Sequence, residues 1–259
     1  MISIIICSID EGKLARVVRN YVSLLQGEEF EIIVIRDAKS LCEGYNRGIR
    51  QSKGSILIFS HDDIEILSPD FAAKLKQAFC LHDVVGVAGT SVLMNANWAI
   101  RGQPHIHGVV VYPPGVVGNE GYMVNVFGAE TPVISGIQGL DGMFIAAKRE
   151  VVERVGFDEQ TFDGFHCYDT DFTFSAYLAG FRVAVCAEII IAHHSAGNFG
   201  EAWSKYNARF VEKHQGRLYT GERGSLRCAA LQASSAASVL RLCDPPRLAE
   251  MTAKIRNNH

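Results

Sequence analysis

The stretch Ile56-Leu57-Ile58-Phe59-Ser60-His61-Asp62-Asp63-Ile64 decides the fold of this chain. Apolar residues lead into His61, Asp62 and Asp63, a pattern typical of a buried strand whose C-terminal tip emerges at a surface. In open α/β sheets, ligands bind at these carboxyl ends. Two adjacent carboxylates repel each other unless a cation or a proton relieves them. The stretch therefore predicts either a divalent-metal site for a phosphorylated ligand or an acidic turn that caps the next helix.

The residues before this stretch repeat one kind of unit. Apolar runs at 2–7 and 31–35 predict two buried strands, and apolar residues at helical spacing over 14–25 predict a helix between them. Ser40 can cap a second helix that runs to about residue 51. Strands and helices that alternate at this spacing predict right-handed crossovers and a parallel sheet. The fold class is therefore α/β.

A parallel sheet would bring three polar strand tips to one edge. The candidate nucleotide-binding residues on these tips are Ser8, Asp10, Glu11, Asp37 and Asp62. Taken singly, Asp10 and Asp37 are more typical of turns or helix caps. Taken together, the three tips favour a nucleotide pocket.

The chain changes character after residue 64. Ser68 and Pro69 are expected to begin a helix with the proline at its first position, and 84–88 to form a fourth strand. Residues 91–136 carry Gly and Pro breaks and two plausible strands, 107–112 and 122–127. This region predicts an antiparallel excursion that builds a second wall of the pocket.

A second acidic cluster follows residue 139. Asp141 lies between glycines, which permit close backbone approach to a ligand. Asp169 and Asp171 are expected at the N-terminus of a helix, where plain capping by Asp169 is the competing interpretation. His193 ends a short strand and is a candidate third metal ligand, against the alternative of a solvent-facing turn histidine.

Composition narrows the function classes. The chain has 259 residues and a net charge of −3, which argues against wholesale nucleic-acid binding. Its seven cysteines are scattered and form no C-x-x-C pair, so we expect a reducing, cytoplasmic setting. The apolar N-terminus lacks the basic start of a signal peptide, and we find no run long enough to span a membrane.

The order of these parts resembles the family 2 glycosyltransferases, nucleotide-sugar enzymes with the GT-A fold. It is most similar to the branch whose metal motif reads His-x-Asp in place of Asp-x-Asp. The resemblance covers residues 2–210 and implies a mostly parallel central sheet, a small antiparallel excursion and C-terminal helices. The matching segments are 4–11 at the family's first strand and Pro-x-Tyr-Asn-Glu loop, 45–49 at its Asn-x-Gly-Ile segment, 61–63 at its metal motif, and 168–171 at its Glu-Asp-x-Asp signature. Cys7, Ile9 and Tyr168 depart from the family pattern.

The resemblance implies roles for single residues. It implies that Mg²⁺ or Mn²⁺ is held by Asp63 with His61 and His193. Asp37 stands where a family acid meets the nucleotide base, and Asn46 lies in the matching Asn-x-Gly-Ile segment; with the other tip residues they would bind a nucleotide-diphosphate sugar. Asp169 takes the place of the catalytic base of an inverting displacement. Asp141 would position the acceptor or the donor sugar and is the second choice for the base. The acceptor would be a hydroxyl of an unidentified glycan or glycolipid.

Two other functions compete with this interpretation. A sugar-nucleotide nucleotidyltransferase would be expected to carry a glycine-rich, basic phosphate loop after its first strand, whereas residues 8–12 are acidic. A non-catalytic sugar- or nucleotide-binding scaffold would explain the lost motif residues.

The C-terminal part is expected to differ from the rest. We divide the chain into a glycosyltransferase domain at 1–214, with a nucleotide-binding half (1–90) and an acceptor half (91–214), and a helical extension at 215–259. A helix is expected over 224–242, broken from a last short helix by two prolines. From residue 215 onward, seven basic residues outnumber three acidic ones. Such a tail could contact the inner face of an anionic membrane, although a solvated face or an oligomer contact is more common.

Overall fold

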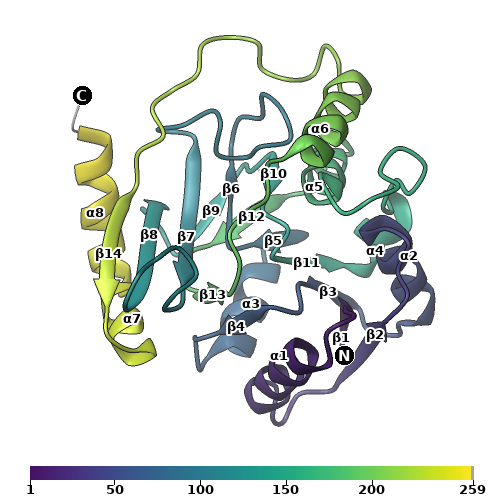
Figure 1. Ribbon diagram of the computed structural model, residues 1–259, viewed down its shortest axis with the longest axis horizontal. Coiled ribbons are helices and arrows are strands. Elements are labelled where there is room, and N and C mark those ends of the chain that lie inside the picture. Colours follow the sequence, from purple (N-terminus) through teal and green to yellow (C-terminus); the bar gives the residue numbers. More distant parts are fainter. Residues whose placement is uncertain (258–259) are drawn as a thin grey trace.

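The first three apolar runs pair as a parallel unit in the computed structural model, which describes residues 1–257. Strand β1 lies between β2 and β3 and is parallel to both, as the sequence predicts (Figure 1). Strand β11 then adds to β3 in the antiparallel direction, so the sheet as a whole is mixed. In spatial order its strands are β2 (Phe30–Ile35), β1 (Ile2–Cys7), β3 (Ile56–Ser60), β11 (Phe144–Lys148), β5 (Val84–Gly86), β12 (Val183–Cys186) and β9 (Val133–Ser135).

A second sheet is built around the long strand β7. Its pairing with β8 is antiparallel, which confirms the expected excursion. The members of this sheet are β10 (Gly139–Leu140), β6 (Ala88–Thr90), β7 (Ile106–Tyr112), β13 (Ile191–His193), β4 (Ile64–Ile66), β8 (Tyr122–Gly128) and β14 (Ala229–Ala233). The fourth strand expected at 84–88 is in fact two short strands, because the chain leaves the central sheet as β5 and enters the second sheet as β6.

Helices cover both faces of the central sheet. The described helices are α1 (Glu11–Leu24), α2 (Leu41–Gln51), α3 (Phe71–Phe79), α4 (Arg149–Arg154), α5 (Tyr168–Leu178), α6 (Glu201–Lys213), α7 (Ala236–Leu242) and α8 (Pro245–Asn257). Alternate residues of β1 point to opposite faces. Ile5 packs into the core that α2, α5 and α6 complete, whereas Ile4 and Ile6 pack into the core that α1 and α3 complete. Burial on both sides explains the continuous apolar character of this strand.

Side-chain caps fix several helix starts. The Ser40 hydroxyl accepts a hydrogen bond from the backbone N–H of Glu43, as predicted for α2. Helix α3 begins at Phe71 and not at Pro69, so that expectation is wrong. The reason is that Ser68 is engaged elsewhere: its buried hydroxyl donates to the carbonyl of Glu188 and accepts from the N–H of Ile190.

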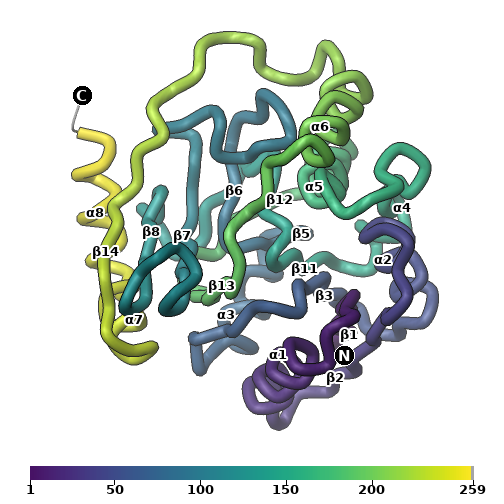
Figure 2. The backbone as a smooth tube through the Cα atoms, in the orientation of Figure 1, coloured from purple at the N-terminus to yellow at the C-terminus, as the bar shows by residue number. Residues whose placement is uncertain are grey.

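The C-terminal part contains a strand that the sequence did not predict. A helix was expected over 224–242, but residues 229–233 form β14, antiparallel to β8. Without β14, one edge of β8 would expose unpaired backbone groups, so non-local pairing outweighs local helix propensity. Before β14, residues 214–228 arch from the end of α6 across the molecule, as Figure 2 shows. The last two residues of the expected extension lie outside the described part.

Within residues 1–257, none of the helices combines the length and apolar character that crossing a bilayer requires.

Ser68→Ala should destabilise the protein, because the substitution leaves the buried N–H of Ile190 without its partner and removes one of two hydrogen bonds to the carbonyl of Glu188, which Lys74 also donates to. We expect the free energy of unfolding to fall by about 1–3 kcal/mol, measured by denaturant titration. Ser23→Ala is the matched control, since the exposed Ser23 hydroxyl bonds only to the carbonyl of Asn20. The control should change stability by less than about 0.5 kcal/mol. Equal effects of the two variants would contradict this account.

Candidate functional site

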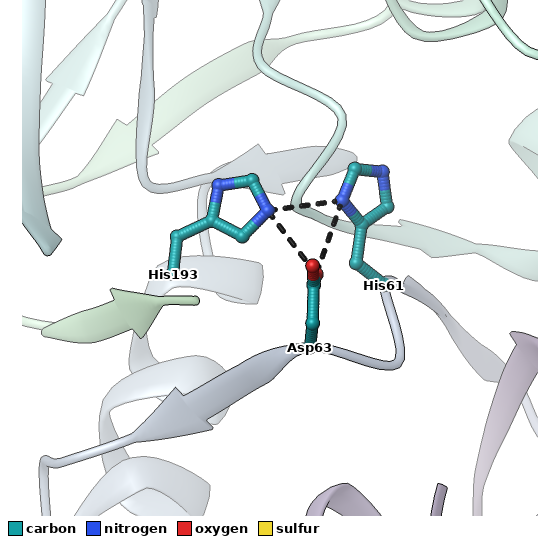
Figure 3. A group of neighbouring side chains, drawn as sticks. All are labelled: His61, Asp63 and His193. Carbon is teal, nitrogen blue, oxygen red and sulfur yellow. Dashed lines mark hydrogen bonds and ion pairs between the residues drawn. The ribbon is translucent and has the colours of Figure 1, made fainter. Parts of the chain in front are cut away.

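Three side chains that could hold a metal ion, those of His61, Asp63 and His193, converge where β3, β4 and β13 meet (Figure 3), and we call them the metal cluster. His193 Nε2 lies 3.2 Å from Asp63 Oδ1 and 3.3 Å from His61 Nδ1. The distance from His61 Nδ1 to Asp63 Oδ1 is 3.9 Å. The three ligand atoms all lie within 4.8 Å of one another, so a single cation could contact all of them. The structure thus brings together the three residues that the sequence singled out for a metal.

Strand pairing places these three side chains. Antiparallel pairing sets His193 opposite Ile64, directly beside Asp63, and the next N–H, from His194, donates to the Asp63 carbonyl. The N–H of His61 donates to the carbonyl of Met143, in continuation of the pairing between β3 and β11. The cluster is therefore held by backbone hydrogen bonds and does not depend on flexible loops.

The charges of the cluster suit a divalent cation. Burial and the neighbouring His193 lower the pKa of His61 to about 4, so its imidazole is neutral at pH 7 and has a lone pair for a metal. Burial alone would raise the pKa of Asp63, but hydrogen bonding from His193 holds it well below its usual range. One carboxylate oxygen and two imidazole nitrogens are a donor set that divalent transition metals accept.

The second acidic cluster lines a cavity of about 500 Å³ that it shares with the two histidines of the metal cluster. Asp141 and Asp169 both face this cavity, together with His61 and His193. The second acidic cluster therefore shares its cavity with His61 and His193, whereas Asp62 and Asp63 line a neighbouring pocket. Much of the remaining wall is aromatic and comes from Trp98, Tyr112, Phe127, Phe165, Phe199 and Trp203.

The two acids of the cavity are in different states. Asp141 is fixed by two hydrogen bonds, one from the Trp98 indole N–H at 2.9 Å and one from the N–H of Met143 at 2.9 Å. Asp169 is partly buried. Burial, followed by the nearby charge of Asp141, raises the pKa of Asp169 to about 7. Asp169 can therefore take up or release a proton near neutral pH.

Helix α5 does not begin with an acidic cap, so the capping interpretation of Asp169 is wrong. Cys167 is the N-cap residue, with a left-handed backbone (φ 62°) and no side-chain cap hydrogen bond. Asp171 instead ties α5 to α6, because its buried carboxylate accepts from Lys213 and His214, both at 2.8 Å. Asp169 therefore does not cap the helix, whereas Asp171 stabilises the packing of α5 against α6.

The candidate nucleotide-binding residues are less closely grouped. Ser8 donates to Asp62 at 2.6 Å, which joins the tips of β1 and β3 beside the metal cluster. Asp10 caps α1 by accepting from the N–H of Lys13. Asn46 is not brought to this group, since its amide pairs with the backbone of Phe157 through two hydrogen bonds.

The two remaining acidic tip residues form ion pairs at the surface. Glu11 pairs with Arg36 at 3.0 Å, and Asp37 pairs with Arg47 at 2.9 Å. Both acids are exposed, so a ligand could reach them from solvent.

Sequence reasoning missed two residues of the site, Lys13 and Trp98. Lys13 Nζ lies 3.6 Å from Asp63 Oδ2. Its position three residues after Asp10, the N-cap of α1, was the feature of the sequence that could have pointed to it. Nothing in the sequence around Trp98 pointed to its bond with Asp141. The sequence predicted that a glycine beside Asp141 would allow close approach to a ligand. Gly142 instead packs against side chains of the site, because a Cβ there would clash with the Tyr168 hydroxyl and lie 2.9 Å from Asp169 Oδ2.

Comparisons with known proteins agree with this architecture. The model of a family described as "Glycosyltransferase like family" matches residues 3–214. Among solved structures, the mannosyltransferase PcManGT from Pyrobaculum calidifontis, in complex with GDP-Man and Mn²⁺, has a TM-score of 0.50 and 12% identity over 98% of this chain and 73% of that chain. S. aureus TarS in complex with UDP-GlcNAc has a TM-score of 0.43 and 15% identity over 78% of this chain and 60% of that chain. No curated protein sequence matches. The predicted GT-A fold is confirmed.

Asp169→Asn should change the pH dependence of stability. A carboxyl group whose folded pKa is raised, here from 3.8 to about 7, stabilises the fold below pH 3.8, and this contribution is lost as pH rises through about 7. The wild type should therefore lose stability between pH 5 and pH 8 relative to the variant. Because the carboxyl is partly open to the cavity, we expect a difference of about 1–2 kcal/mol. Denaturant titrations at both pH values measure it, and an equal variant-minus-wild-type difference at both would contradict the raised pKa.

Proposed function

We infer that this chain, which belongs to the glycosyltransferase-like family, transfers a sugar from a nucleoside-diphosphate sugar to an acceptor hydroxyl. One observation supports this most strongly: the two histidines of a His61–Asp63–His193 cluster suited to a metal line the same cavity as Asp169, whose pKa is about 7. In the reaction, the bond from the anomeric carbon to the diphosphate breaks and a bond to the acceptor oxygen forms. The acceptor proton must pass to a base.

The metal cluster would serve the leaving group. When bound there, a divalent cation neutralises charge that gathers on the departing diphosphate. We propose Mn²⁺ in preference to Mg²⁺, because two of the three donors are imidazole nitrogens and Mg²⁺ prefers oxygen ligands. The His61-x-Asp63 order also fits the branch of the family with a His-x-Asp motif. Lys13, beside Asp63, would add positive charge near the diphosphate.

Asp169 is the proposed base. Its pKa of about 7 lets it accept a proton from the acceptor hydroxyl near neutral pH. Asp141 is the weaker candidate, since both of its oxygens already accept hydrogen bonds, and we assign it to positioning the acceptor or the donor sugar. A base in the same cavity as His61 and His193 suits a single displacement with inversion.

The donor and the acceptor would enter from different parts of the chain. Residues 1–90 carry the strand tips, where Ser8 and Asp62 would bind ribose or phosphate oxygens and Glu11 and Asp37 would contact the nucleoside. Residues 91–214 supply most of the cavity wall, whose aromatic side chains suit the apolar face of a sugar ring. Leu226, from the basic segment 214–228, lies at the same cavity, which fits a glycolipid acceptor at an anionic surface.

Asp169→Asn should lower turnover by about 10²- to 10⁴-fold, because the amide cannot accept the acceptor proton. Release of nucleoside diphosphate from a panel of UDP- and GDP-sugars with Mn²⁺ measures this, and calorimetry should show nucleotide affinity within about threefold of the wild type. Asp70→Asn, at an exposed acid that pairs with Lys74 on α3, is the control and should keep full turnover. Unchanged turnover in Asp169→Asn would remove this residue from the base role. Failure of the wild type to turn over any donor would favour a non-catalytic scaffold.

His193→Ala should weaken Mn²⁺ binding by about 10- to 100-fold, because it removes one of three ligands. The adjacent His194→Ala is the matched control, since that side chain is half-exposed and faces Glu65 at 3.9 Å. Isothermal titration of the nucleotide-free protein with MnCl₂ separates the two variants. Equal Mn²⁺ affinities in both would show that the cluster does not hold the metal.

A further inference from the structure

The hydroxyl of Tyr168 connects the metal cluster to the second acidic cluster. Tyr168 Oη lies 2.7 Å from His61 Nε2 and 3.2 Å from the carbonyl oxygen of Gly142. The side chain is buried at the first residue of α5, next to Asp169. It therefore contacts the side of the His61 ring that faces away from Asp63.

Hydrogen-bond accounting gives the direction of both contacts. A phenol has one hydrogen to donate, and the Gly142 carbonyl can only accept. Both bonds form only if Tyr168 donates to Gly142 and accepts from His61 Nε2. The proton of the neutral His61 ring then lies on Nε2. Its Nδ1 carries a lone pair directed at Asp63 and His193, at 3.9 and 3.3 Å.

We propose that Tyr168 is a positioning residue that fixes the Nε2-protonated tautomer of His61 and so makes Nδ1 available to a divalent cation. The proposal rests on the metal site assigned under the proposed function. Metal-bound histidines generally donate their other ring N–H to a partner that sets the tautomer and the ring orientation. Here that partner is an uncharged phenol within the core.

The surroundings of Tyr168 hold the hydroxyl in place. Its ring packs in an aromatic cluster with Tyr45 and Phe157, with ring centroids 5.6 and 6.4 Å away. The missing side chain at Gly142 leaves the room that the hydroxyl occupies. Because α5 also carries Asp169 at its next position, the first turn of one helix supports the metal ligand and presents the proposed base.

Tyr168→Phe tests the proposal, since it removes only the hydroxyl. We expect the Mn²⁺ dissociation constant, measured by titration calorimetry or Mn²⁺ electron paramagnetic resonance, to rise about 10- to 100-fold. Tyr206→Phe is the control: it removes the hydroxyl of another buried tyrosine, one that donates to Asp163. The control should bind Mn²⁺ within about twofold of the wild type. Equal affinities in wild type and Tyr168→Phe would overturn the proposal.

Two further readouts separate positioning from a general structural effect. Nitrogen-15 shifts of the His61 ring in the metal-free protein should show the Nε2-protonated tautomer in the wild type and a mixture in Tyr168→Phe. In a His61→Ala background, Tyr168→Phe should cause no further loss of Mn²⁺ affinity, because a positioning residue acts only through its ligand. Additive losses would show that Tyr168 acts by another route.

The outcomes also distinguish this proposal from the proposed function. If the wild type and Tyr168→Phe bind Mn²⁺ equally and show the same tautomer, the positioning role fails while the metal site stands. If the wild type binds no Mn²⁺, with or without a nucleoside diphosphate, the metal site itself fails and this role for Tyr168 fails with it.

Discussion

The site depends on the two different pairings of β3. On one edge β3 runs parallel to β1, which brings Ser8 beside Asp62. On the other edge it runs antiparallel to β11, which brings the carbonyl of Met143 to the backbone N–H of His61 and the carbonyl of Gly142 to the hydroxyl of Tyr168. The parallel edge therefore assembles the groups that we propose bind a nucleotide, and the antiparallel edge assembles those that we propose take part in the chemistry. The two groups of residues lie together because the buried strand β3 pairs with two neighbouring strands that run in opposite directions.

Each acid in this region has its negative charge relieved in a different way. Asp63 has two histidines and Lys13 nearby, and Asp141 accepts hydrogen bonds from an indole and a backbone N–H. Asp171 is neutralised by partners on α6. Asp169 has no comparable cation, so desolvation and its acidic neighbour dominate and its proton affinity rises. The difference in function that we propose for these carboxylates follows from their partners.

Local patterns in the sequence were enough for much of the fold and for two members of the metal cluster, Asp63 and His193, whereas His61 became a candidate ligand through the family resemblance. The apolar runs, the Ser40 cap and the polar strand tips depend on neighbouring residues, which is why they could be predicted. What could not be predicted depends on distant partners. Residues 229–233 become a strand only because β8 offers an edge, and Trp98 reaches Asp141 from a region without a recognisable motif. The start of α5 depends on the left-handed backbone conformation of Cys167, and the residue types in this segment do not predict that conformation.

Because Gly142 has no side chain, the substitutions that this position can tolerate are restricted. A methyl group there would clash both with the Tyr168 phenol, which we propose orients a metal ligand, and with Asp169, which we propose as the base. Any side chain at position 142 would therefore disturb both the proposed metal ligand and the proposed base. We therefore expect active relatives with this aromatic residue at position 168 to retain glycine at 142, so that natural variation tracks the two positions together.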